Sequence, residues 1–240
     1  MTLNTFEFMN GLFSLIFISI SILVGIRVAL KYWKNKERVY VLVGLTWIGM
    51  ATPWCPSSLS FLSILMTGKG LPLEFKFFIA IFFIAFTTLF WLTAFTDLLY
   101  KEKQKIILII FGIIGIIFDA IFLFFLFTEP SFIGKEVGHV DEDYSLFVNI
   151  YVIGILIITI ITGTLFARAS IKLGTPEMRL RGISLLIAFY SFVIGTMFDM
   201  FSPLSVIILI IARLILISSA IEFYCGFVLP EWLKRILIKE

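Results

Sequence analysis

The sequence predicts an all-α integral membrane protein: a single seven-transmembrane-helix bundle over residues 1–240, with the N-terminus outside and the C-terminus in the cytoplasm. Three observations support this prediction: the composition, the length of the apolar segments and the distribution of the basic residues. Of the 240 residues, 60% are hydrophobic and 15% are charged, and the mean hydropathy is +1.09. A soluble domain has about one quarter charged residues, and a chain this apolar would expose large hydrophobic patches in water. Lipid is therefore the solvent that fits.

Seven segments are long enough to cross a membrane, which takes about 20 predominantly apolar residues for a hydrocarbon core of roughly 30 Å. None alternates with the period of a barrel strand, so all seven are predicted to be helices. We expect the first to be a retained span, because no Lys or Arg precedes Arg27 and no A-x-A cleavage site follows. The predicted spans are 8–32, 38–57, 74–99, 105–128, 146–168, 180–200 and 203–229.

The second span contains two prolines, Pro53 and Pro56, in "TPWCPSS". Proline removes a helical hydrogen bond and clashes with the preceding turn, so these residues predict a kink or an end. The segment that follows, "LSFLSILMTGKGLP", is then expected to be an outer loop or a partly buried re-entrant piece.

Small residues at helical spacing mark faces where helices pack closely within a membrane. They form predicted packing stripes on spans one, four and six: Asn10, Ser14, Ser21 and Gly25; Gly112, Gly115 and Asp119; and Ser184, Ala188, Ser191 and Gly195.

The basic residues predict the orientation, since cytoplasmic loops carry an excess of Lys and Arg. Three basic residues fall on the other side of the membrane (Lys69, Lys76 and Lys135), and Arg213 completes the nineteen. The cytoplasmic side receives fifteen: Arg27, Lys31, Lys34, Lys36, Arg38, Lys101, Lys103, Lys105, Arg168, Lys172, Arg179, Arg181, Lys234, Arg235 and Lys239.

The outer segment between spans four and five, "TEPSFIGKEVGHVDEDY", contains the single histidine of the chain. His139 with Glu136, Asp141, Glu142 and Asp143 is a candidate for a divalent-metal site. Nothing in their spacing fixes a coordination geometry, so a solvated acidic loop is the favoured interpretation and no metal site is expected.

Arg213 is a charge within the last apolar segment, ten residues from Pro203 and so about 15 Å deep. At that depth it must face the bundle interior and find an acceptor. Asp119, ten residues from Glu129 in span four, has the same depth and is the expected partner. Depth places Asp199 at the outer interface, too far from Arg213.

The candidate buried polar site is therefore Arg213 with Asp119. Its role is either a structural ion pair or an anion-binding or gating position, and Asp119 facing a second subunit is the alternative to pairing. Glu222 is a secondary charge near the cytoplasmic face, expected to tie span seven to Arg27 or Arg168.

Known catalytic patterns are missing from the sequence. Span seven has no lysine on which a retinal Schiff base could form, and no HExxH, GxSxG or Gly-rich phosphate loop occurs. We therefore expect no enzyme activity, no cofactor and no nucleic-acid partner.

The segment "RLILISSAIEFYCGFVLPEWLKRI" resembles the last helix of the seven-helix membrane sensor regions that precede histidine-kinase modules in prokaryotes, and of stand-alone archaeal seven-helix proteins. The shared features are a buried Arg213, small residues after it, the aromatic pair Phe223 and Tyr224, and a Gly–Phe–x–x–Pro exit. The resemblance covers about 25 of 240 residues and implies a sensor. Since no output domain appears before Glu240, the signal would pass to a separate cytoplasmic effector protein through "LPEWLKRILIKE".

Three functions follow as hypotheses for a multi-pass protein of the cell membrane, with membrane lipids and a homo-oligomer as further expected partners. The first is the receptor-like module. The second is a small-solute transporter built from parallel three-helix repeats, because "RASIKLGTPEMR" repeats the basic spacing of "RVALKYWKNKER". The third is a structural or lipid-associating protein.

Overall fold

All seven predicted spans are helical in the computed structural model, which describes residues 3–201 and 205–237. Each is long and apolar enough to cross a membrane, which confirms the all-α membrane bundle. The spans are Thr5–Asn35, Arg38–Thr67, Leu73–Leu99, Lys101–Thr128, Leu146–Lys172, Pro176–Phe201 and Val206–Val228. The expected start of the last span, 203–204, lies outside the described residues.

Eleven α-helices, three short 3-10 helices and one two-stranded sheet make up the described chain. They are α1 (Thr5–Ala29), α2 (Lys31–Asn35), α3 (Arg38–Met50), η1 (Thr52–Trp54), α4 (Cys55–Thr67), α5 (Leu73–Ile81), α6 (Ile84–Leu99), η2 (Lys101–Lys103), α7 (Gln104–Thr128), η3 (Pro130–Phe132), β1 (Gly134–Val137), β2 (Asp141–Tyr144), α8 (Leu146–Lys172), α9 (Pro176–Phe201), α10 (Val206–Val228) and α11 (Glu231–Leu237).

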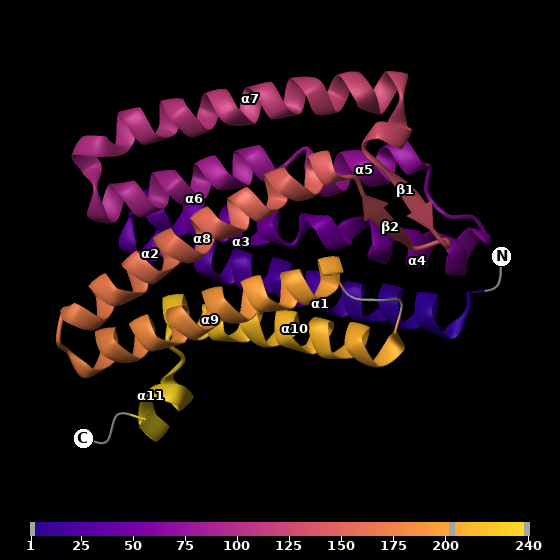
Figure 1. Ribbon diagram of the computed structural model, residues 1–240. Helices are drawn as coiled ribbons and strands as arrows, with labels where there is room; N and C mark the ends of the chain where they lie inside the picture. Colours follow the sequence, from indigo (N-terminus) through magenta and orange to yellow (C-terminus); the bar gives the residue numbers. More distant parts are fainter. Residues whose placement is uncertain (1–2, 202–204, 238–240) are drawn as a thin grey trace.

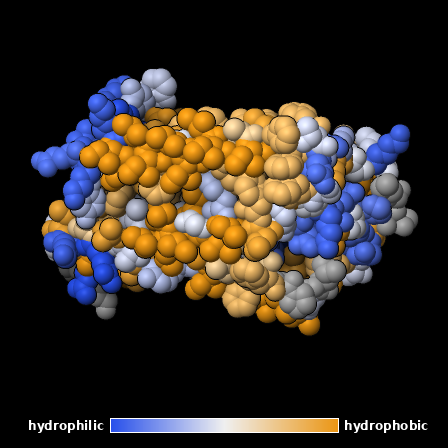
Figure 2. Space-filling view, turned by 45° about the horizontal axis from the view of Figure 1, so that its top comes forward, coloured by the Kyte–Doolittle hydropathy of each residue, from blue (hydrophilic) through white to orange (hydrophobic). Residues whose placement is uncertain are grey.

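The long helices lie along a common direction, so the molecule has two ends (Figure 1). We call the end that carries the β1–β2 hairpin and the start of α1 the hairpin end, and the end that carries α2, η2 and α11 the basic end. Helices α7 and α10 lie at opposite edges of the bundle (Figure 1). An apolar belt separates two hydrophilic ends (Figure 2), as expected for helices surrounded by lipid.

The second span continues through its prolines. Pro53 and Pro56 lie in η1 and in the first turn of α4, positions where the missing N–H of proline costs no helical hydrogen bond. The expectation of an outer loop or re-entrant piece after residue 57 is therefore wrong, since α4 extends the helix to Thr67. The third span is also interrupted, between α5 and α6 at Phe82 and Phe83.

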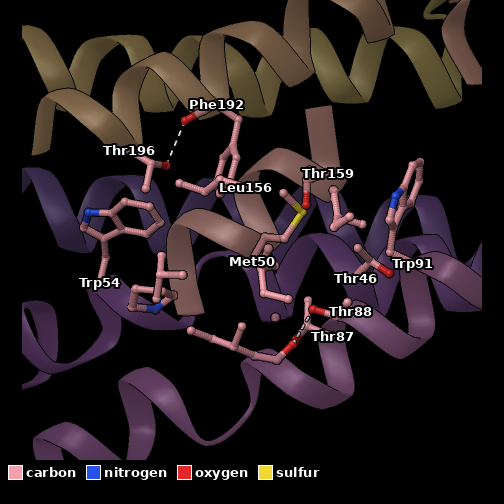
Figure 3. A pocket seen from close by; sticks show the side chains of 16 residues that line it. Thr46, Met50, Trp54, Thr87, Thr88, Trp91, Leu156, Thr159, Phe192 and Thr196 are labelled. Atoms are coloured by element: carbon pink, nitrogen blue, oxygen red, sulfur yellow. Dashed lines mark hydrogen bonds between the residues drawn. The ribbon is translucent and has the colours of Figure 1, made fainter. Parts of the chain in front are cut away.

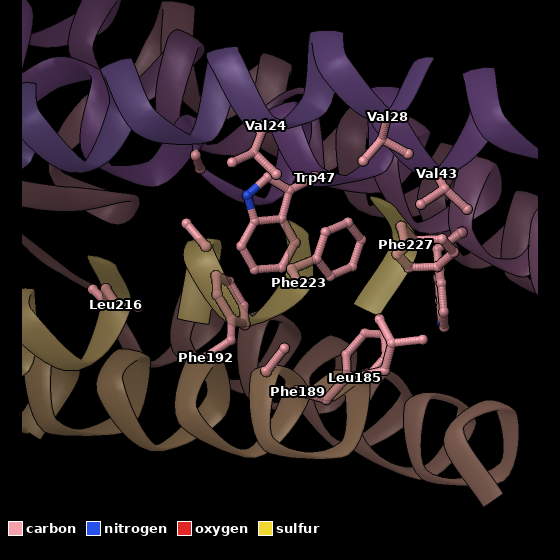
Figure 4. Close-up of a cluster of buried hydrophobic side chains, with 14 of the residues drawn as sticks. Val24, Val28, Val43, Trp47, Leu185, Phe189, Phe192, Leu216, Phe223 and Phe227 are labelled. Atoms are coloured by element: carbon pink, nitrogen blue, oxygen red, sulfur yellow. The ribbon is translucent and has the colours of Figure 1, made fainter. Parts of the chain in front are cut away.

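The core between α1, α3, α9 and α10 is aromatic (Figure 4). Trp47 stacks on Phe223 with ring centroids 4.0 Å apart. The predicted stripe on the first span is buried, and at its end Gly25 faces Gly44 so closely that a methyl group on Gly25 would lie 2.7 Å from the Gly44 carbonyl oxygen. Two glycines here permit the close approach of α1 and α3.

The acidic segment before α8 forms an antiparallel hairpin, in which Gly134 pairs with Tyr144 and Val137 with Asp141. Val140 at its turn is fully buried, and the Glu142 side chain is only 3% exposed. The expectation of a merely solvated loop is wrong, because the hairpin packs against the bundle and folds Asp141 and Glu142 inward, whereas Glu136 and Asp143 stay exposed.

Candidate ligand site at the hairpin end

A cavity of about 450 Å³ lies between the hairpin and the helices beneath it. This size falls within the range of small-molecule sites, roughly 300–1,000 Å³. Its charged lining residues are Lys135, Asp141, Glu142, Asp143, Asp199 and Arg213. The cavity therefore combines an apolar bundle with a ring of charges contributed by the hairpin and by α9 and α10.

Arg213 is the central charge of the cavity and is only 2% exposed. One terminal nitrogen donates to Asp199 Oδ2 at 2.8 Å, and the other donates to Asn10 Oδ1 at 2.6 Å. The Trp54 ring lies 5.8 Å from the guanidinium carbon, and the Trp54 indole N–H donates to the same Asp199 oxygen at 2.8 Å. Four elements, α1, η1, α9 and α10, thus meet at one buried ion pair.

The expected pairing of Arg213 with Asp119 is corrected by this geometry. Helix α10 begins at Val206, so the Arg213 backbone is about 10 Å from the helix start, not at the middle of the span. Side chains tilt toward the N-terminus of their helix, so the long Arg213 side chain reaches the hairpin end, where Asp199 lies two residues before the end of α9. A comparison of backbone depths alone therefore excluded Asp199, which is the actual partner of Arg213.

Asp119 lies on α7, across the bundle from α10 (Figure 1). It is 8% exposed, and its Oδ1 atom has no hydrogen-bond partner. The adjacent Phe118 stacks on Tyr151 of α8 at 3.6 Å, which sets the face of α7 that carries Asp119. The structure therefore keeps Asp119 buried but separate from Arg213.

Glu222 accepts a hydrogen bond from Ser218 of its own helix at 2.5 Å. Among the described residues no ion pair joins Glu222 to Arg27 or Arg168. The expected tie to the basic loops is therefore wrong.

Lys76 anchors the hairpin and was not identified as a site residue from the sequence. It is fully buried, and its ammonium group donates to Glu136 at 2.7 Å and to the His139 carbonyl oxygen at 3.0 Å. It also lies 3.4 Å from Glu142. From α1, the Glu7 carboxylate accepts the His139 backbone N–H at 2.7 Å. These contacts hold the lid-like hairpin over the cavity.

Burial changes the protonation of the hairpin carboxyls. It raises the pKa of Glu142 to about 7, with Lys76 acting in the opposite direction. It also raises the pKa of Asp141, although Arg213 and Asn10 partly oppose the shift. The pKa of the Tyr144 hydroxyl lies well above its ordinary value because burial and both carboxylates disfavour the phenolate. Tyr144 is thus a protonated donor in the cavity wall.

Three buried polar atoms of cavity-lining residues lack hydrogen-bond partners: the acceptor Glu142 Oε1 and two donors, Arg213 Nε and the Tyr144 hydroxyl. Burying such donors without an acceptor costs free energy, so they are available to a ligand. No cluster of three or more His, Cys, Asp and Glu residues able to hold a metal ion occurs in the described ranges.

A smaller cavity of about 50 Å³ lies deeper in the bundle and shares Trp54 and Thr196 with the first (Figure 3). Four of its threonine hydroxyls, those of Thr46, Thr87, Thr88 and Thr196, donate to carbonyls of their own helices, as Thr196 does to Phe192 at 2.8 Å. Since these four donors are already used and the remaining lining is largely apolar, this space is mainly an apolar gap.

Comparisons of the chain with protein-family models, with curated proteins and with solved structures find no match.

Proposed function

We propose that the protein is a receptor-like membrane module that binds a small solute in the hairpin-end cavity. The observation that carries the proposal is Arg213, which lines the cavity and at the same time joins α10 to α9 and α1. A ligand that changes this network changes the contacts between three membrane helices. Ligand binding can shift a conformational equilibrium only through such differential contacts.

The basic residues support the proposed orientation, in which the hairpin end faces the outside of the cell membrane and the basic end the cytoplasm. Helix α2, η2 and α11 all carry lysine or arginine at the basic end. The cavity would then open toward extracellular solutes.

Helix α10 offers a direct route from the cavity to the basic end. Its last carbonyl groups accept hydrogen bonds from two cations, Lys31 to Phe227 at 3.1 Å and Arg181 to Phe227 at 2.7 Å. Cations at a helix C-terminus are favoured by the helix dipole. Beyond this exit, Lys234 of α11 pairs with Glu177 of α9. Movement of α10 would therefore reach α11, the proposed contact for a separate effector.

The test compares two methionine-to-tryptophan variants at the hairpin end. Met200 lines the cavity, whereas Met66 is exposed at the end of α4 and lies outside it. A solute that raises the thermal stability of the wild type should equally stabilise Met66→Trp and should not stabilise Met200→Trp. Equal stabilisation of both variants, or no stabilising solute at all, would contradict binding in this cavity.

A transporter is the second candidate, favoured by the two interrupted spans. The interruptions at Thr52–Trp54 and Phe82–Phe83 lie in neighbouring spans, and Trp54 and Ile81 beside them line the cavity. Discontinuous helices of this kind form the substrate sites of many transporters. The proposed parallel repeat stays a prediction, and α9 and α10 are uninterrupted helices.

Two readouts distinguish the candidates. A fluorophore attached to Ile236→Cys on α11 should respond to the ligand if the protein is a receptor. Ligand-driven uptake into proteoliposomes, lost in Met200→Trp, would instead identify a transporter.

A further inference from the structure

We propose that the cavity selects a small organic cation, a molecule with a protonated or quaternary ammonium group. This inference rests on the proposed function, because it names the ligand class of the same cavity. An organic cation also takes the place of the anionic ligand that the buried Arg213 suggests from the sequence alone.

Arg213 has little capacity left for an anion. Both terminal nitrogens already donate, one to Asp199 and one to Asn10, and Trp54 lies over the guanidinium group. Recognition of a carboxylate or phosphate by arginine uses two parallel N–H donors. Only Nε is unpartnered. An incoming anion would have to displace Asp199 and leave that carboxylate buried without its cation.

The walls of the cavity carry more carboxylates than cations. Four carboxylates line it (Asp141, Glu142, Asp143 and Asp199), against Lys135 and Arg213. Each cation is already paired, Lys135 with Asp143 at 3.2 Å and Arg213 with Asp199 at 2.8 Å.

The remaining two carboxylates differ in their surroundings. Glu142 lies 3.4 Å from Lys76, which reaches it from beneath. Asp141 belongs to no ion pair in the part of the chain that the structure describes. A concave site lined by an excess of one charge focuses the field and attracts the opposite charge. Asp141 is therefore the proposed counter-ion of the ligand.

The other lining groups favour an organic cation over a metal ion. The carboxylates are distributed along the hairpin and α9 and do not converge on one point. Phe6, Trp54 and Tyr144 add aromatic surface, which stabilises ammonium groups through cation–π attraction. The free donors, Tyr144 hydroxyl and Arg213 Nε, suit a hydroxyl or ether oxygen on the same molecule.

Binding of probes of matched shape tests the charge preference. The probes are choline, ethanolamine, the uncharged alcohol in which carbon replaces the choline nitrogen, and the anion of tert-butylacetic acid. Affinities are measured by titration calorimetry at constant ionic strength, on the full chain in phosphatidylglycerol nanodiscs, whose headgroups carry no ammonium. We expect choline or ethanolamine to bind at least tenfold more tightly than the alcohol, and the anion to bind no better than the alcohol.

Two variants locate the binding. Asp141→Asn should weaken cation binding at least tenfold while leaving thermal stability near that of the wild type. Glu74→Gln removes one negative charge at the same end, but Glu74 is exposed and outside the cavity. The affinity of this control variant for the cation should therefore equal that of the wild type. If Asp141→Asn unfolds, Asp143→Asn at the exposed rim provides the second test, with a smaller loss expected.

The outcomes separate the two proposals. Tighter binding of the anion, lost in Met200→Trp, would overturn the cation inference and keep the proposed function. Absence of binding by every probe would overturn the cation inference alone if another solute stabilises the wild type and not Met200→Trp, and would overturn both proposals if no such solute exists. A cation affinity that falls in phosphatidylcholine nanodiscs would identify a lipid headgroup as the source of the ammonium group, whereas an unchanged affinity would identify a free solute. Either result supports the ligand class.

Discussion

At the scale of single residues, the ion pair between Arg213 and Asp199 is the most consequential contact of the molecule. A charged side chain in a membrane helix is costly unless it faces the protein interior and is paired. Here the pair is completed by Asn10 and by the Trp54 indole N–H, so the four groups depend on one another. Removing one member leaves the others buried without partners.

Replacement of Arg213 by methionine should lower the free energy of unfolding by about 3–5 kcal/mol, the usual cost of breaking a buried ion pair from one side. The double variant Arg213→Met with Asp199→Leu should recover most of this loss, because no uncompensated charge remains. Reversible unfolding in mixed detergent micelles measures both. Asp119→Asn should change stability little, and a loss as large as that of Arg213→Met would show that Asp119 supports the arginine after all.

The buried Glu142 carboxyl gives the protein a predicted pH dependence. Its pKa is about 7 in the folded protein against an ordinary value of 4.5, because burial and the neighbouring Asp141 and Glu136 outweigh Lys76. Between these two values the folded protein holds a proton that the unfolded chain has released. The free energy of unfolding should therefore fall as pH rises from 4.5 to 7.

Glu142→Gln should reduce this slope. Asp141, whose pKa burial also raises, contributes a remainder of the same sign. Glu74→Gln serves as the control and should keep the full slope. Unfolding curves recorded across this pH range provide the measurement, and a slope unaffected by Glu142→Gln would show that another group titrates.

At the scale of helices, close packing depends on glycines whose neighbours leave no room for a side chain. A methyl group on Gly44 would collide with the Gly25 carbonyl oxygen and with Ala29, all of which belong to the α1–α3 contact. Backbone atoms of two long helices cannot move aside independently. The contact is therefore sensitive to the smallest possible substitution.

Gly44→Ala should destabilise the protein by about 1–3 kcal/mol through overpacking. Gly112→Ala is the matched control, since a methyl group there would meet no atom within 4 Å. Alanine also favours the helix by up to about 1 kcal/mol, so the control should be neutral or stabilising. Thermal unfolding of the two variants side by side tests whether this glycine contact holds the helices together.

At the scale of the whole molecule, the two ends differ in the sign of their charge. The hairpin end holds the carboxylates of the cavity, and the basic end holds most of the lysine and arginine residues. This asymmetry agrees with the proposed orientation, and it would place an acid-rich ligand cavity outside and a basic effector surface inside.

Cysteine labelling checks the orientation in intact cells. Lys135→Cys replaces a side chain that is 74% exposed on the hairpin, and Lys103→Cys replaces an exposed one in η2. The native Cys55 and Cys225 are first replaced by serine. A membrane-impermeant maleimide should label Lys135→Cys directly and Lys103→Cys only after lysis. The reverse pattern would invert the proposed topology.

The sequence by itself determined the seven helical spans, because length and hydropathy are properties of each segment alone. The sequence also located the interruption of the second span at Pro53, although α4 continues this span to Thr67. Only the tertiary structure decided the partners of Arg213, since these depend on the reach of a long side chain across three helices and not on backbone depth. It likewise turned an acidic segment that looks solvated into the wall of a cavity, because burial of Val140, Glu142 and Lys76 arises from contacts between distant parts of the chain.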